Sequence, residues 1–344
     1  MRRMLNSLFI TTQGAWLSLR NGNIVVNVDG EEKASFPAIN FGSILCFGRV
    51  NATPPLMGFC ADNGVSLSFF KENGRFLARV QGPVHGNVLL RRAQYRLADD
   101  EKASAEIARD VLIGKLANTR TVLRRFLRDH PQEGEAAEKF RSALSVTEAL
   151  APQLKAAKDT EELRGYEGTA ARAYFDAFDG MILHQKEHFK FTERTRRPPR
   201  DAVNAMLSYI YSILASEAAS ALEGAGLDPA VGFLHKDRPG RPSLALDLME
   251  EFRTWLADRL VLSMINMKQV KPEDFRTSES GAVEMDGGAK KKLIAEWQSR
   301  KQDEITHPYT GEKMPIGMVP HMQAMLLARR IRGDMREYPP FVWK

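Results

Sequence analysis

The residue pattern of the chain changes at residues 82–86 (GPVHG), and this change constrains the fold more than any other feature. Before it, short apolar segments alternate with tight-turn sequences. After it, apolar residues recur every three or four positions in long segments rich in Ala, Leu, Arg and Glu. The first pattern is typical of β-strands and the second of amphipathic helices. We therefore predict an α+β protein, with a small N-terminal β domain over residues 1–88 and a larger all-α domain over residues 89–344.

The turns of the first part and the helices of the second can be placed along the chain. Asn21-Gly22 separates two apolar segments, and these two residues readily adopt the positive φ angles of a two-residue hairpin turn. A second hairpin is predicted over residues 66–80, with Glu72-Asn73-Gly74 at its turn. In the second part, the apolar spacing predicts helices near residues 102–129, 135–157, 160–180, 201–223, 244–265, 288–302 and 318–333.

Composition narrows the class of protein. A chain of 344 residues, 43% hydrophobic and 27% charged, is long enough for two domains with cores of their own. Cys46 and Cys60 both lie in apolar surroundings, which indicates reduced core thiols and a cytoplasmic protein, not a disulfide framework. Polar residues interrupt the N-terminal region, so we expect no signal peptide, and no apolar stretch predicts a membrane span.

Positive charge is concentrated in two places. The net charge of +6 is mild for this length, but residues 186–200 hold six basic residues against two acidic ones. Phe189 and Phe191 interleave with these charges, a pattern found on surfaces that bind a nucleic-acid backbone. A second basic group surrounds His235. A solvated helix edge is the competing interpretation of residues 186–200 alone. The basic residues that we predict to bind DNA are Arg194, Arg196, Arg197, Arg200, Lys236, Arg238 and Arg241.

The stretch from His235 to Glu250 carries the chemistry. Pro242 and Ser243 are typical of a helix start, with Ser243 as the predicted N-cap. The helix then places Asp247 and Glu250 one turn apart on one face. Two carboxylates beside a histidine, at the end of a cationic loop, are typical of a site for a hard divalent metal that works on phosphates.

Each of these residues also has a purely structural interpretation. Glu167, between Gly165 and Gly168, could be a surface glutamate on a helix whose glycines permit a close backbone approach. His235 could be a hydrogen-bonded histidine near a helix start. Asp247 and Glu250 could be acids that complement the helix dipole.

A different motif points to another class of enzyme. Residues 184–188 (HQKEH) fit the H-x-x-E-H pattern of a zinc protease, in which two histidines one helical turn apart bind Zn²⁺. The motif falls where a predicted helix ends, and no downstream glutamate stands out as a third ligand. We keep this protease as a remote alternative.

Three ordered segments together resemble a known family. Residues 165–175 (GYEGTAARAYF), residues 196–208 (RRPPRDAVNAMLS) and the stretch 235–250 are similar to the motifs of the CRISPR-associated integrase family Cas1. That family also has an N-terminal β domain followed by a helical catalytic domain. Residues 4–9 (MLNSLF) and 13–19 (QGAWLSL) look most like members from subtype I-C systems.

The resemblance implies a reaction and the residues that carry it out. It implies that Glu167, His235 and Glu250 bind a catalytic Mg²⁺ or Mn²⁺, and that Asp247 lies beside them as a further catalytic residue. Many members have aspartate at the position of Glu250. The glutamate of this chain keeps the carboxylate but reaches one methylene further. In the family, the 3′-hydroxyl of a short foreign DNA attacks a phosphodiester of the CRISPR repeat, which inserts a new spacer for antiviral defence. Water in place of that hydroxyl would give endonuclease activity.

The resemblance also implies partners. These are a short double-stranded DNA, the CRISPR repeat, a second copy bound through the β domain as a homodimer, and the small protein Cas2. A non-catalytic DNA-binding scaffold is the alternative function, in which the same basic residues bind DNA and the acids only support helix packing.

Overall fold

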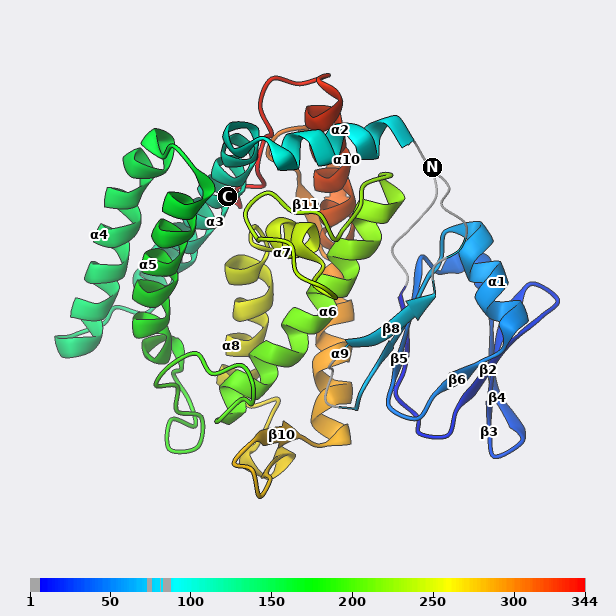
Figure 1. Cartoon of the computed structure of the whole chain (residues 1–344). Helices are drawn as coiled ribbons and strands as arrows, with labels where there is room; N and C mark the ends of the chain where they lie inside the picture. Colours follow the sequence, from blue (N-terminus) through cyan, green and yellow to red (C-terminus); the bar gives the residue numbers. More distant parts are fainter. Residues whose placement is uncertain (1–6, 73–75, 81, 83–87, 344) are drawn as a thin grey trace. The chain divides into compact units, whose positions relative to one another are not determined.

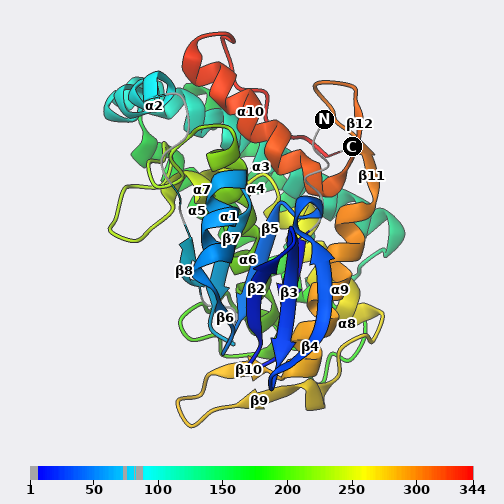
Figure 2. The ribbon, with the colours of Figure 1, turned by 90° about the vertical axis from the view of Figure 1, so that its right-hand side faces the viewer.

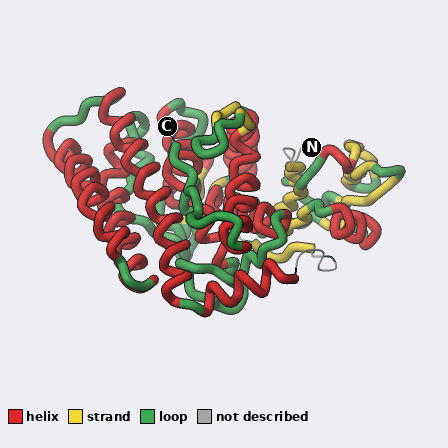
Figure 3. The backbone as a smooth tube through the Cα atoms, turned by 90° about the horizontal axis from the view of Figure 1, so that it is seen from above, coloured by secondary structure: helices red, strands yellow, loops and turns green. Residues whose placement is uncertain are grey.

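The structure of the chain is a computed structural model that describes residues 7–72, 76–80, 82 and 88–343 (Figure 1). The chain divides into two compact units, and each is described here by itself. The first unit comprises Met1–Gly86, Met285–Ile305 and Met314–Met318, and the second comprises Asn87–Glu284, Thr306–Lys313 and Val319–Lys344. A β-rich N-terminal part and a larger helical part are thus present, as the sequence predicts (Figure 3).

The first unit contains two four-stranded sheets. One has the strand order β4-β3-β2-β6, and Figure 2 shows β2, β3 and β4 side by side; the other has the order β1-β5-β7-β8. In the second sheet β1, β5 and β7 are parallel, and β8 is antiparallel to β7. The elements are β1 (Ser7–Ile10), β2 (Trp16–Arg20), β3 (Asn23–Val28), β4 (Glu31–Pro37), η1 (Ala38–Asn40), β5 (Ser43–Phe47), β6 (Asn51–Ala52), α1 (Pro54–Asn63), β7 (Ser66–Phe70), β8 (Phe76–Val80), α9 (Gly287–Gln302) and η5 (Ile316–Met318).

The predicted hairpins are present, and α1 was not predicted. Asn21 and Gly22 join β2 to β3 with φ angles of 49° and 75°, the left-handed values that a tight hairpin turn requires. Strands β7 and β8 pair as the second hairpin; of its predicted turn Glu72-Asn73-Gly74, residues 73 and 74 lie outside the described residues. Helix α9 belongs to the first unit, not to the helical part in which the domain bounds of 89–344 place it.

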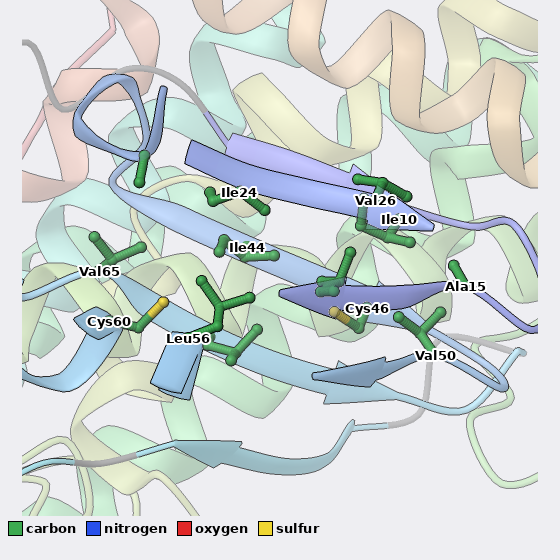
Figure 4. Packing of buried hydrophobic residues seen from close by; sticks show 13 residues of the cluster. Ile10, Ala15, Ile24, Val26, Ile44, Cys46, Val50, Leu56, Cys60 and Val65 are labelled. Carbon is green, nitrogen blue, oxygen red and sulfur yellow. The ribbon is translucent and has the colours of Figure 1, made fainter. Parts of the chain in front are cut away.

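The core of the first unit draws on both sheets and on α1 (Figure 4). Ile24 of β3, Ile44 of β5 and Leu56 of α1 are fully buried in one cluster. Cys46 and Cys60 belong to the same cluster as free thiols, which confirms their predicted state. Burial raises the pKa of each thiol to about 12, so both remain protonated and serve as core residues.

The remaining described part of the chain is mostly helical, and the long predicted helices are confirmed except the one over residues 244–265. Short strand pairs β9–β10 and β11–β12 and the helix α2 are additions to the predicted all-α pattern. The elements are α2 (Val88–Asp99), α3 (Glu101–Asp129), α4 (Gly134–Ala156), α5 (Thr160–Phe178), η2 (Asp179–Met181), α6 (Ala202–Gly224), α7 (Ser243–Met249), the π-helix η3 (Arg253–Asp258), α8 (Arg259–Asn266), η4 (Pro272–Asp274), β9 (Phe275–Thr277), β10 (Val283–Met285), β11 (Glu304–Thr306), β12 (Lys313–Pro315) and α10 (Val319–Arg332).

Helix α6 is long and apolar enough to cross a membrane by length and composition, although the sequence analysis expected no such stretch. In the structure, 61% of its most apolar window is buried inside the protein. Its apolar residues include Ile210, Ile213 and Leu214, each fully buried. The composition of α6 is therefore that of a core helix.

A C-terminal segment, residues 338–343, is fastened into the helical unit by two polar side chains. The carboxylate of Glu251 accepts hydrogen bonds from the Tyr338 hydroxyl at 2.6 Å and from the Phe341 backbone N–H at 2.7 Å. Asn118 of α3 donates to the Phe341 carbonyl at 2.9 Å and accepts from the Trp343 N–H at 2.7 Å. This segment therefore completes the core around Glu251, which is fully buried.

Candidate active site

Helix α5 positions Glu167. Asp159 caps the helix, since its carboxylate accepts from the backbone N–H groups of Glu161 and Glu162. Leu163 and Ala170 face the core on either side of Glu167, whose side chain is 27% exposed. The capped helix thus presents one carboxylate at the edge of the buried face.

The two glycines that flank Glu167 do not serve a close approach within the chain. A Cβ atom added at Gly165 or at Gly168 would meet nothing within 4 Å. The close-approach interpretation from the sequence is therefore wrong for contacts within this chain, and α5 leaves bare surface on both sides of the carboxylate.

A loop carries His235, and Asp247 organises that loop. Asp247 Oδ2 accepts from the N–H groups of Phe233 at 2.6 Å and of Leu234 at 3.0 Å. Asp247 Oδ1 accepts from the backbone N–H of His235 at 3.0 Å and lies 2.7 Å from its ring Nδ1. Both carboxylate oxygens of this buried residue are therefore occupied, and Asp247 orients His235.

Close packing explains the shape of the loop. A Cβ atom at Gly232 would lie 2.9 Å from Asp247 Oδ2, so only glycine lets the loop reach the carboxylate. The Leu234 carbonyl accepts from the Arg164 guanidinium at 2.8 Å, and Lys236 pairs with Glu161 at 2.9 Å. Two side chains of α5 thereby fasten the loop that holds His235.

The helix that carries Asp247 differs from the prediction at both ends. Pro242, not Ser243, occupies the N-cap position; the Ser243 hydroxyl instead donates to the Lys236 carbonyl. The expected continuous helix over 244–265 is interrupted: α7 ends at Met249, and a π-helix precedes α8. Glu250 lies just after the last residue of α7.

Glu250 is fully buried among positive charges. Its Oε2 pairs with Lys115 Nζ at 2.7 Å, and its Oε1 pairs with Arg253 Nη2 at 3.1 Å. Burial by itself would raise the pKa of Glu250, but the charges of Arg253, Lys115 and His235 hold that pKa at about 2. Glu250 is therefore ionised, and His235 is close enough to contribute to its field.

Lys115 and Arg253 were not among the predicted site residues. Lys115 of α3 pairs with Glu167 as well as with Glu250, so one ammonium group joins the two carboxylates. The sequence held a signal for it, because Lys115, Asn118 and Thr119 occupy core-facing positions in an otherwise apolar stripe of α3. Polar residues on the buried face of a helix point to a structural or functional network.

Glu167, His235 and Glu250 have the donor types that suit Mg²⁺ or Mn²⁺, namely two carboxylates and one imidazole. Asp247 holds Nδ1 of His235, which leaves Nε2 as the ring nitrogen available to a ligand. Within the described part of the chain, no group of three His, Cys, Asp or Glu side chains could hold an ion as it stands. The three donors suit the metal, and in this structure the ammonium group of Lys115 joins the two carboxylates.

A pocket beside Glu167 contains a second polar network that the sequence analysis missed. Lys115, Arg253, Tyr211 and Asp258 are among its lining residues. The Tyr211 hydroxyl donates to Asp258 at 2.5 Å, and the Arg253 guanidinium lies 4.9 Å from the centre of the Tyr211 ring. Burial raises the pKa of Asp258 to about 6.

The predicted DNA-binding residues fall into two groups in the structure. Arg241, partly buried, has its pKa lowered first by burial and then by the nearby charges of Arg238, Arg197 and Arg196. This mutual influence brings the segment 194–200 and the loop 236–241 together as one basic cluster. Arg196, Arg197 and Arg238 are exposed members of this cluster.

The remaining basic residues have partners within the chain. Arg194 donates to the Asn204 side chain at 2.7 Å and to the Ser208 hydroxyl at 3.1 Å, which ties it to α6. Arg200 donates to the Ser280 carbonyl at 2.9 Å. Lys236 is paired with Glu161, as described above.

Two sequence interpretations of the segment 184–191 are wrong. Phe189 and Phe191, expected among the charges on a surface, are 1% and 4% exposed. Their rings pack against Phe275 and against Phe175 and Phe178, respectively. Residues 184–188 form a turn in which Gln185 has a φ of 58°, so the H-x-x-E-H residues do not lie on the helix that a zinc protease requires.

Comparison with known proteins identifies the family. The sequence profile described as "CRISPR associated protein Cas1" matches residues 8–299. A "CRISPR-associated endonuclease Cas1 1" of Chlorobaculum tepidum is 52% identical over 344 residues, which is 100% of both chains.

Two solved structures share the fold. A "casposase bound to integration product" has a TM-score of 0.83 and 24% identity, covering 98% of this chain and 94% of that one. A "Cas6-RT-Cas1–Cas2 complex" contains a chain with a TM-score of 0.82 and 23% identity, covering 99% of this chain and 36% of that one. Together with the full-length match to an endonuclease, these findings confirm the resemblance seen in the three sequence motifs: the chain belongs to the CRISPR-associated Cas1 family of endonucleases.

Proposed function

We propose that this endonuclease is a metal-dependent DNA integrase of CRISPR adaptation, with Glu167, His235 and Glu250 as the ligands of Mg²⁺ or Mn²⁺. The observation that carries the proposal is the gathering of Glu167 and Glu250 around one cation, Lys115, with His235 oriented beside them by Asp247. A divalent ion at these residues would neutralise charge on the reacting phosphate and position the attacking oxygen.

The side chains have distinct roles in this proposal. Asp247 keeps the proton on Nδ1 of His235 and so presents Nε2 to the site. The field of Arg253 keeps Glu250 ionised, as a ligand must be. The basic cluster of Arg196, Arg197, Arg238 and Arg241 would hold the DNA backbone. The attacking group in integration is a DNA 3′-hydroxyl, and water in its place gives cleavage.

The proposal also covers the partners of the protein, its cellular location and its subtype. The solved casposase is bound to an integration product, and another solved relative is part of a complex with Cas2, which supports double-stranded DNA and Cas2 as partners here. We also propose a homodimer formed through the β domain of residues 1–88, a cytoplasmic location in keeping with the free thiols, and membership of subtype I-C.

A strand-transfer assay tests this function. A labelled short duplex is joined to a repeat-bearing target with purified Cas2, in Mn²⁺ or in EDTA. Joining should require Mn²⁺ and should fall by more than about 100-fold in His235→Ala with DNA affinity unchanged, because phosphate contacts carry most of that affinity. His130→Ala, at the exposed end of α3, is the matched control and should join normally.

The alternative is a DNA-binding scaffold without catalysis. It gains support if no joining occurs under any condition despite tight DNA binding. Joining that continues unchanged in EDTA or in His235→Ala instead overturns the proposed metal site. The zinc protease has no support from the turn at residues 184–188.

A further inference from the structure

Lys115 is an unusual residue for the middle of a core helix. It lies in α3 at 6% exposure, next to the buried residues Leu112 and Leu116. Burying an ammonium group is unfavourable unless the charge is paired and hydrogen-bonded. Lys115 meets this condition through Glu167 on one side and Glu250 on the other, 2.7 Å away.

The same oxygens are required by a divalent ion. Lys115 Nζ contacts Glu167 Oε1 and Glu250 Oε2, the carboxylates proposed above as metal ligands. An ammonium hydrogen bond and a metal bond at one carboxylate oxygen compete for its lone pairs. Two cations that share one carboxylate oxygen also repel each other.

A pocket next to Lys115 gives its side chain an alternative position. Lys115 lines the pocket that Glu167, Arg196 and Arg253 share, so its flexible four-carbon stem can swing from the carboxylates toward that space. Arg253 stays paired with the other oxygen of Glu250 and does not depend on Lys115.

We propose that Lys115 is a built-in counter-cation: it holds Glu167 and Glu250 together in the metal-free protein, and a divalent ion displaces it on binding. The inference rests on the proposed metal site and adds a regulatory element to it. Metal affinity is then set by competition with a side chain of the protein, so the site fills only when the free ion is abundant enough to displace the ammonium group.

The test is the affinity of the full-length chain for Mn²⁺, measured by titration calorimetry without DNA. Lys115→Met removes the competitor and its repulsion, so it should bind Mn²⁺ at least about tenfold more tightly than the native chain. Its Tm without metal should fall, because two carboxylates lose a shared partner, and saturating Mn²⁺ should raise its Tm more than that of the native chain. Lys102→Met, an exposed lysine in the first turn of α3, should change neither quantity.

Each outcome bears on a definite claim. If Lys115→Met folds poorly, Lys115→Gln keeps a hydrogen-bond donor without the charge and should show the same tightening. Equal or weaker Mn²⁺ binding in the substituted chains overturns the counter-cation. Absence of Mn²⁺ binding in the native chain and in both Lys115 variants overturns the metal site itself, and so the proposed function.

Discussion

Asp247 lies beside the proposed ligands, but its hydrogen bonds give it a supporting role. Both of its oxygens are occupied by N–H groups of the loop and by the His235 ring. Its negative charge matches these donors, and a Cβ atom at Gly232 would lie 2.9 Å from both Asp247 Oδ2 and Ser243, so the loop needs glycine there. Asp247 therefore positions His235.

Replacement of Asp247 by asparagine tests this role. One oxygen becomes an NH₂ group that faces backbone donors, so the free energy of unfolding should fall by about 1–3 kcal/mol. Mn²⁺ affinity should fall with it, because His235 is no longer held. Urea denaturation and metal titration measure the two effects. Asp237→Asn, an exposed change in the same loop, should alter neither the free energy of unfolding nor the Mn²⁺ affinity. Unchanged values in Asp247→Asn would show that the loop keeps its conformation without the Asp247 carboxylate.

At the level of residues, the sequence predicted what lies close in the chain and missed what lies far away. His235 and Asp247 are 12 positions apart, and their proximity followed from one loop and one helix. Lys115 is 52 positions from Glu167, and no local pattern links the two. Phe189 and Phe191 were misjudged because a run of charges says nothing about which way the side chains between them point.

Helices α3 and α5 each carry glycine at an interior position, with opposite structural reasons. A Cβ atom at Gly114 of α3 would lie 2.7 Å from Pro340 Cβ, in the C-terminal segment that packs there. A Cβ atom at Gly168 of α5 would meet nothing within 4 Å. The first glycine serves packing, whereas the second lowers the stability of its helix without a packing benefit inside the chain.

Alanine at the two positions should therefore change stability in opposite directions. Gly168→Ala should raise the free energy of unfolding by roughly 0.5–1 kcal/mol, since alanine is the better helix former. Gly114→Ala should lower it by about 1–3 kcal/mol through overpacking against Pro340. Urea denaturation of both variants checks the prediction. A stabilising Gly114→Ala would mean that residues 338–343 are not fastened as described.

Element boundaries were the least predictable part of the fold. Leu248, Phe252 and Leu256 keep helical spacing and are all buried, so the sequence predicted one helix across them. Apolar spacing reports which positions face a core, but not which backbone hydrogen bonds form. A turn and a π-helix keep the same positions buried, and they place Glu250 at the break.

For the whole molecule, the distribution of charge matters more than the net value of +6. Arg197 and Arg238 come from segments about forty positions apart, yet both influence Arg241. Their exposure leaves them free to contact phosphates. Arg194 and Arg200, in the same stretch of sequence, are tied to the protein itself.

A double charge reversal tests whether the exposed arginines Arg197 and Arg238 bind DNA. Arg197→Glu/Arg238→Glu should weaken DNA binding by at least about tenfold near 0.1 M salt and make the salt dependence shallower by roughly two phosphate contacts. The control Lys139→Glu/Arg141→Glu changes net charge equally on exposed positions of α4 and should have a smaller effect. Equal losses in the two pairs would assign the affinity to net charge alone. Filter binding across a salt series provides the measurement.

The docking of residues 338–343 has a consequence for the order of events during synthesis. Tyr338 is made 87 positions after Glu251, the residue whose carboxylate it contacts. At the usual rates of translation, this interval lasts roughly 4–18 s. During that time the segment that bears Glu250 has left the decoding centre but lacks the residues that close its core. In a nascent chain, the core around Glu251 therefore closes only after residues 338–343 have been made.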